Sequence, residues 1–167
     1  LYFIPGVALA SWITRTPAIR DALHASTADM GLVLFGLSVG SMLGILTSGW
    51  LVGRFGTRPV LRVLAVTMTA SMPIIGIASQ LGSMPLATAG LAIFGGAMGA
   101  IEVAMNVEGA DIERVGGKPF LPLLHGFFSL GTLLGALAGI YFAAINFSVM
   151  WHLVGAGALS FAGVVYA

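Results

Sequence analysis

The sequence predicts an all-α integral membrane protein whose transmembrane helices form a single bundle of six. Of its 167 residues, 58% are hydrophobic and only 8% are charged, against roughly 25% charged residues in a soluble domain. So few charges cannot cover the outside of a water-soluble fold of this size. The mean hydropathy of +1.03 excludes a disordered chain. The net charge of +1 excludes a nucleic-acid binder.

Six apolar segments, separated by polar or turn-rich breaks, are the predicted helices. A bilayer core about 30 Å thick needs about 20 apolar residues per spanning helix. Membrane strands are shorter and alternate polar with apolar residues, so the lengths favour helices. The segments are Leu1 to about Ile13, Met30–Val52, Val60–Ser79, Leu86–Ala110, Phe120–Ala144 and Ser148–Tyr166. The first is too short to span, and both chain ends lie inside apolar runs. We therefore expect residues 1–167 to be one domain that is truncated at both ends.

The loop charges predict the orientation of these helices. Five of the seven basic residues fall in the loops after the second and fourth segments, at Arg54, Arg58, Arg62, Arg114 and Lys118. Positive charge marks the cytoplasmic side of a membrane protein. The first segment is therefore expected to run outward, with both ends of the chain at the cytoplasmic face.

Two predicted helices carry glycines at intervals of four, which places the glycines of each helix on one face. These are Gly36, Gly40 and Gly44 in the second segment, and Gly131, Gly135 and Gly139 in the fifth. Such faces let a neighbouring helix approach closely. The simpler interpretation is close packing, and the alternative is a smooth face along which helices slide during a transport cycle.

A glycine-rich loop follows the second segment and reads Gly-Trp-Leu-Val-Gly-Arg-Phe-Gly-Thr-Arg over residues 49–58. It resembles the loop between helices 2 and 3 of the major facilitator superfamily, whose pattern is G-x-L-x-D-R-x-G-R-(R/K). Gly49, Leu51, Arg54, Gly56 and Arg58 match in register, whereas Gly53 stands where the family has an aspartate. The resemblance implies that the chain is the N-terminal six-helix half of a twelve-helix transporter, completed by a C-terminal half.

The same loop is predicted to act as a cytoplasmic gate. Gly56 permits a tight turn between antiparallel helices, and Arg54 and Arg58 can reach carboxylates at the membrane edge. In the family, such pairs latch one conformation. Because Gly53 supplies no acid, Glu108 and Asp111 are the candidate partners of the arginines. The alternative is that the arginines only set the topology.

Glu102 is the most informative single residue, because it lies about 24 Å along the fourth segment, inside the hydrocarbon. An ionised carboxylate there is costly unless it faces a cavity, has a partner or carries a proton. It shares a helix stripe with Asn106 and several glycines, as expected of a cavity wall. The alternative is a structural ion pair or buried hydrogen bond between helices.

The fifth segment carries a second polar stripe that includes His125 and Ser129. Counted from the connecting loop, His125 lies at about the depth of Asn106 and Ser129 at about that of Glu102. These four residues are the predicted substrate and proton site. A Ser–His pair could also do nucleophilic chemistry, but no orienting acid lies on that helix, so we do not expect an enzyme.

Residues 96–106, Gly-Ala-Met-Gly-Ala-Ile-Glu-Val-Ala-Met-Asn, resemble the fourth helix of the fucose–proton symporter branch of the superfamily. That branch carries G-x-x-x-E-x-x-x-N-P, with its carboxylate tied to substrate and proton. Glu102 and Asn106 match, and Val107 replaces the proline. The branch also has an aspartate on helix 1, whereas the first acid here is Asp21, in a loop.

Together these features predict a proton-coupled permease, a symporter, that moves a small polar solute by alternating access. The alternative is a non-transporting scaffold or receptor that keeps the transporter fold. We expect an integral protein of a bacterial inner (plasma) membrane. No cofactor or metal is predicted, with a proton gradient as the energy source. There is no cysteine for a disulfide or a thiolate metal site.

Overall fold

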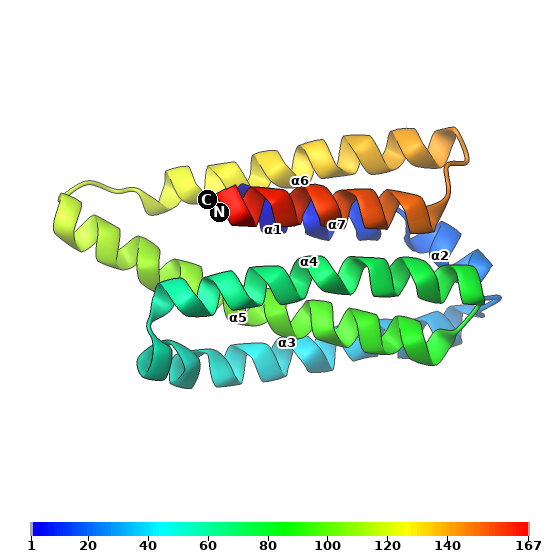
Figure 1. Cartoon of the computed structure of the whole chain (residues 1–167), viewed down its shortest axis with the longest axis horizontal. Coiled ribbons are helices and arrows are strands. Elements are labelled where there is room, and N and C mark those ends of the chain that lie inside the picture. Colours follow the sequence, from blue (N-terminus) through cyan, green and yellow to red (C-terminus); the bar gives the residue numbers. More distant parts are fainter. Residues whose placement is uncertain (1, 167) are drawn as a thin grey trace.

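The chain is all-helical in the computed structural model, which describes residues 2–166 and contains no strand within them. The predicted all-α membrane fold is confirmed, and Figure 1 shows the helices running along one long axis. Their bounds are α1 Phe3–Ile13, α2 Thr16–Ala22, α3 Thr27–Phe55, α4 Thr57–Leu81, α5 Met84–Gly116, α6 Leu121–Ala144 and α7 Val149–Tyr166.

Five of these helices, α3 to α7, are long and apolar enough to cross a membrane. They correspond to the second to sixth predicted segments. The first predicted segment is α1, an apolar helix of 11 residues, and its first residue, Leu1, lies outside the described residues. Helix α1 is too short to span by itself, as its sequence indicated.

Helix α2 occupies a stretch that the sequence analysis treated as a polar loop. Pro17 lies in its first turn, where the missing N–H of proline costs no hydrogen bond. Ile19 and Leu23 are buried at this end of the bundle. The expectation was wrong here because seven residues are too few to show a helical period among the charges of Arg20 and Asp21.

Helix α5 is also longer than predicted, since it continues past Ala110 to Gly116. Its 33 residues span about 50 Å, well beyond a bilayer core of about 30 Å. The added turns carry Asp111, Glu113 and Arg114, which a hydropathy criterion rejects although a helix in water accepts them. Figure 1 shows this end of α5 extending past the turn between α3 and α4.

The glycine faces of α3 and α6 lie at their contacts with neighbouring helices. A Cβ on Gly40 of α3 would lie 2.0 Å from the carbonyl oxygen of Ala92 in α5. A Cβ on Gly131 of α6 would lie 2.2 Å from the carbonyl oxygen of Phe3 in α1. Both distances are far shorter than a carbon–oxygen contact allows. The two faces are therefore packing surfaces that join α3 to α5 and α6 to α1.

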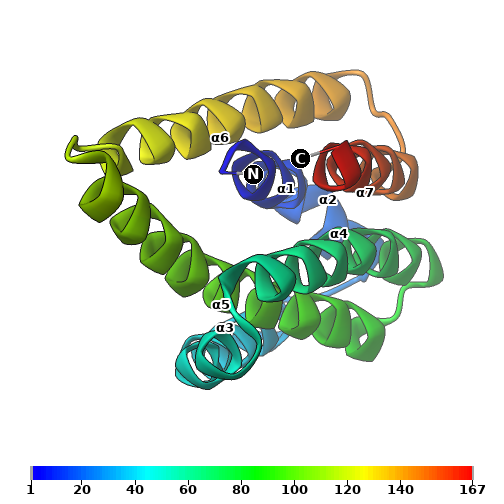
Figure 2. The same cartoon turned by 60° about the vertical axis from the view of Figure 1, so that its left-hand side comes forward.

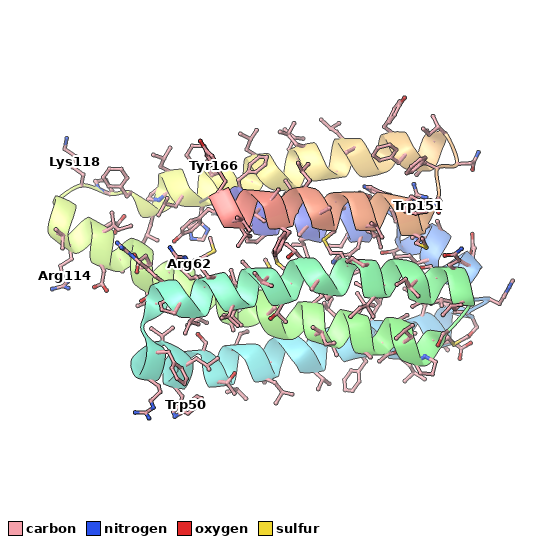
Figure 3. All side chains as sticks on the ribbon, viewed as in Figure 1. Trp50, Arg62, Arg114, Lys118, Trp151 and Tyr166 are labelled. Carbon is pink, nitrogen blue, oxygen red and sulfur yellow. The ribbon has the colours of Figure 1, made fainter. Side chains whose placement is uncertain are left out.

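The two ends of the bundle differ in charge. Figure 3 places Arg62, Arg114 and Lys118 at the same end, which also holds the α3–α4 and α5–α6 connections. Trp50, near this end, and Trp151, near the other, are both exposed. Tryptophan at both ends of a helix bundle is typical of the two membrane–water interfaces. The end that holds these three basic residues is the predicted cytoplasmic face.

Candidate functional site

The candidate site is a cavity of about 200 Å³ between α1, α5 and α6. Figure 2 shows α5 and α6 meeting at their connecting loop and then spreading apart. Helix α6 packs mainly on α1 and only slightly on α5, and the cavity is open on one side. The residues that line the cavity are Tyr2, Pro5, Leu9, Met98, Ile101, Glu102, Met105, Asn106, His125 and Phe128.

Three of the four predicted site residues meet in this cavity. Asn106 of α5 and His125 of α6 form a hydrogen bond, with 3.1 Å between Asn106 Oδ1 and His125 Nε2. Since the amide oxygen accepts, His125 donates from Nε2, which leaves Nδ1 without the ring proton when the imidazole is neutral. Glu102 lies one helical turn from Asn106 on the same wall.

Glu102 has no hydrogen bond or ion pair from its side chain within residues 2–166; the three ion pairs there are Arg20–Asp21, Arg58–Glu108 and Arg114–Asp111. It is exposed on the open side of the cavity rather than buried against a neighbouring helix. Residues 2–166 therefore provide no ion pair or hydrogen bond for the Glu102 side chain, which is what the structural alternative required. A carboxylate in this setting is available to a proton or a solute.

Ser129, the fourth predicted member, does not line the cavity and is exposed. Helix α6 is oriented by its glycine face, which is pressed against α1. At 3.6 residues per turn, Ser129 lies about 160° around α6 from Gly131, on the far side from α1. The depth of a residue can be counted from sequence, whereas the rotation of its helix depends on what the helix packs against.

Tyr2 is a part of the site that the sequence analysis did not single out. Its ring meets that of His125 edge to face, with the ring centroids 6.1 Å apart. Its hydroxyl donates a hydrogen bond to the main-chain carbonyl of Met105. Tyr2 therefore ties the start of α1 to the same walls as Asn106 and His125. No signal in the sequence pairs α1 with α5 and α6, because that contact depends on the packing.

The glycine-rich loop forms a tight turn between α3 and α4. Gly56 has a φ of 80°, a conformation that glycine adopts without strain. Gly49 and Gly53 face open space, with nothing within 4 Å of a Cβ added at either position. Gly53 is thus a place where an acid would fit sterically, although this chain has none there.

One arginine of this loop reaches an acid on α5. Arg58 Nε lies 3.6 Å from Glu108 Oε1. Asp111, the other candidate partner, pairs instead with Arg114 one turn along its own helix, at 3.2 Å. Arg54 forms no ion pair within the part of the chain that the structure describes. The Arg58 side chain is 82% exposed, and such surface pairs contribute at most about 1 kcal/mol.

At the opposite end, Arg15 is buried although it lies in the turn between α1 and α2. It is 3% exposed, and its guanidinium donates a hydrogen bond to the carbonyl of Phe147, in the connection between α6 and α7. Burial lowers the pKa of this guanidinium. Arg15 therefore joins two connections at the predicted outer face, a role its position among loop charges did not indicate.

Comparison with known proteins gives three informative relatives, all bacterial. The chain is 31% identical over 135 residues to an uncharacterized MFS-type transporter of Yersinia pestis, covering 81% of this chain and 34% of that protein. It is 30% identical over 144 residues to an uncharacterized transporter of Sinorhizobium fredii, covering 86% of this chain and 37% of that protein. It is 28% identical over 136 residues to the membrane protein MosC of Rhizobium meliloti, covering 81% of this chain and 33% of that protein.

These relatives support membership of the major facilitator superfamily. The chain spans about a third of the length of these curated relatives, which is consistent with one half of the superfamily's fold. The resemblance to the fucose–proton symporter branch stays a prediction, because none of these names points to it. No family model matches the chain. No solved structure matches it either.

Proposed function

We propose that this chain is one half of a secondary transporter that moves a small polar solute across a bacterial inner membrane, driven by a proton gradient. The observation that carries the proposal is Glu102, a membrane-depth carboxylate that lines a cavity and has no partner within residues 2–166. Intramembrane acids of this kind typically mark solute or proton pathways. The transporter names and bacterial sources of two relatives support the same class of function and membrane.

The open side of the cavity supports a second half as the partner of this chain. Transporters of this architecture hold the solute between two repeats and rock one repeat against the other. A second half facing α5 and α6 would close the cavity that Glu102, Asn106 and His125 line. Asn106 and His125 would then supply hydrogen bonds to the solute, while Glu102 takes up and releases the proton.

The direct test is reconstitution of the complete protein in proteoliposomes, with uptake measured across a panel of sugars, drugs and metabolites. A transporter accumulates at least one solute when an inward or outward proton gradient is imposed. Accumulation should collapse when an ionophore dissipates the gradient. Binding without accumulation under any gradient would favour the alternative, a scaffold or receptor. That alternative draws on Gly53, where the expected gate carboxylate is missing.

Reversing the charge of Arg58 should alter transport by a small factor. Arg58→Glu would place a second carboxylate beside that of Glu108. The exposed ion pair that it removes contributes at most about 1 kcal/mol, which corresponds to about a five-fold change in a conformational equilibrium. We expect the uptake rate of Arg58→Glu to fall roughly two- to five-fold. The double exchange Arg58→Glu with Glu108→Arg should recover most of the rate.

Arg114→Glu is the matched control, because its partner Asp111 lies on the same helix and links nothing across the loop. Its uptake rate should stay near that of the unmodified protein. A double exchange no better than Arg58→Glu alone would show that the contact between Arg58 and Glu108 has no part in gating.

A further inference from the structure

The cavity has an unbalanced charge. Glu102 is the single carboxylate among the residues that line it, and no lysine or arginine of the described chain is among them. Arg114, the arginine nearest to Glu102 in sequence, pairs with Asp111, and Arg58 pairs with Glu108. When Glu102 is ionised, its charge has no protein cation to neutralise it on these walls. An ionised carboxylate at this depth is costly, so a proton, the solute or the opposite wall of the site must supply the compensation.

Three ring side chains line the same cavity as this carboxylate. Tyr2, His125 and Phe128 line the same cavity, and Tyr2 and His125 already meet edge to face. Ring faces attract an ammonium group, and the attraction grows when water is excluded. The remaining walls are largely aliphatic, with Met98 and Ile101 among them. The described walls thus combine one negative charge, several rings and apolar surface.

We propose that the solute is a small organic cation, a protonated amine whose ammonium group binds Glu102. This inference rests on the proposed function and names the substrate class of the same cavity. An anionic solute would be repelled by Glu102, and a neutral polyol would leave its charge uncompensated. The hydrogen-bonded Asn106 and His125 lie one turn nearer the cytoplasm and offer polar contacts to the rest of the solute.

Because the proton and the amine would share the Glu102 carboxylate, this residue also determines how their movements across the membrane are coupled. The protonated Glu102 loses its proton to water when the ammonium ion binds, so one cation enters the site and one proton leaves it. The charge at the site is unchanged by this replacement, and no bond other than that O–H bond is broken. Because Glu102 cannot hold both at once, the two cations compete for it. This favours exchange of the amine against protons over symport.

The test uses the complete protein in proteoliposomes and two sets of polar solutes matched in size. The first set is glucosamine, glucose and glucuronate, and the second is 3-amino-1,2-propanediol, glycerol and lactate. A pH-sensitive dye inside the vesicles reports proton flux. We expect at least one of the two cations to move at ten or more times the rate of its neutral and anionic counterparts, with protons moving the opposite way.

Two substitutions of Glu102 distinguish a loss of cation binding from misfolding of the protein. Glu102→Gln should lose cation transport, whereas Glu102→Asp, which keeps the charge, should retain a measurable part of it. Asp111→Asn is the matched control outside the cavity and should transport normally. Preferential movement of a neutral or anionic solute, or cation transport that survives Glu102→Gln, would overturn the inference while leaving the proposed function standing. Movement of no solute by the folded protein would contradict the proposed function itself.

Discussion

Replacing Glu102 by glutamine is expected to abolish gradient-driven accumulation by the complete protein. Glutamine keeps the size and polarity of the side chain but cannot bind or release a proton, so the link between the gradient and the solute is lost. Accumulation should fall at least about a hundred-fold, which corresponds to about 2.7 kcal/mol of lost coupling. The measurement is the steady-state ratio of solute inside to outside the proteoliposomes under an imposed proton gradient.

Exchange of solute for solute, without net movement, provides the control for this variant. If Glu102 acts in proton release but a solute such as a neutral polyol binds elsewhere on the cavity wall, exchange survives in Glu102→Gln. If the solute is a cation held by Glu102 itself, exchange is lost as well. Normal concentrative uptake by Glu102→Gln would refute the proton role under either binding mode.

The second large effect is expected on stability, at the contact between α3 and α5. Gly40→Leu would drive a side chain into the main chain of α5, because even a Cβ would lie 2.0 Å from the carbonyl oxygen of Ala92. The helices would have to separate, and overpacking of this kind costs about 3 kcal/mol or more. We expect the thermal unfolding midpoint in detergent to fall sharply, or the folded protein to fail to accumulate.

Gly31→Ala is the matched control on the same helix, since nothing lies within 4 Å of a Cβ added at that position. Alanine there should leave the unfolding midpoint unchanged or raise it slightly, because alanine favours a helix over glycine by about 0.5–1 kcal/mol. Equal midpoints for Gly40→Leu and the unmodified protein would mean that α3 and α5 are not joined along this glycine face.

Most of the fold could be predicted from composition and hydropathy alone. A bilayer fixes the length of a spanning helix, so long apolar segments such as those of α4 and α6 are plain in the sequence. The parts that were missed lie outside the bilayer, where this rule does not apply. Helix α2 is held by the buried side chains of Ile19 and Leu23, whereas the residues of α5 beyond Ala110 are mostly exposed. Both segments leave little trace in hydropathy.

The site was predictable in its depth but not in its rotation. Counting along the helices brought Asn106 and His125 to the same level, and they are hydrogen-bonded. The same counting included Ser129, which α6 turns away from the cavity because its glycine face packs on α1. It also missed Tyr2, since the position of α1 beside α5 and α6 depends on contacts between distant segments.

The central claim, that Glu102 faces a water-accessible path, can be tested most directly by cysteine accessibility. The chain contains no cysteine, so a thiol introduced by Glu102→Cys or Asn106→Cys is unique within it, once any cysteines elsewhere in the complete protein are replaced. Val66→Cys on α4, at a similar depth and exposed, is the lipid-facing control. We predict that a membrane-impermeant thiosulfonate modifies the thiols at positions 102 and 106 and spares the one at 66. A thiol at 102 as unreactive as that at 66 would contradict the account.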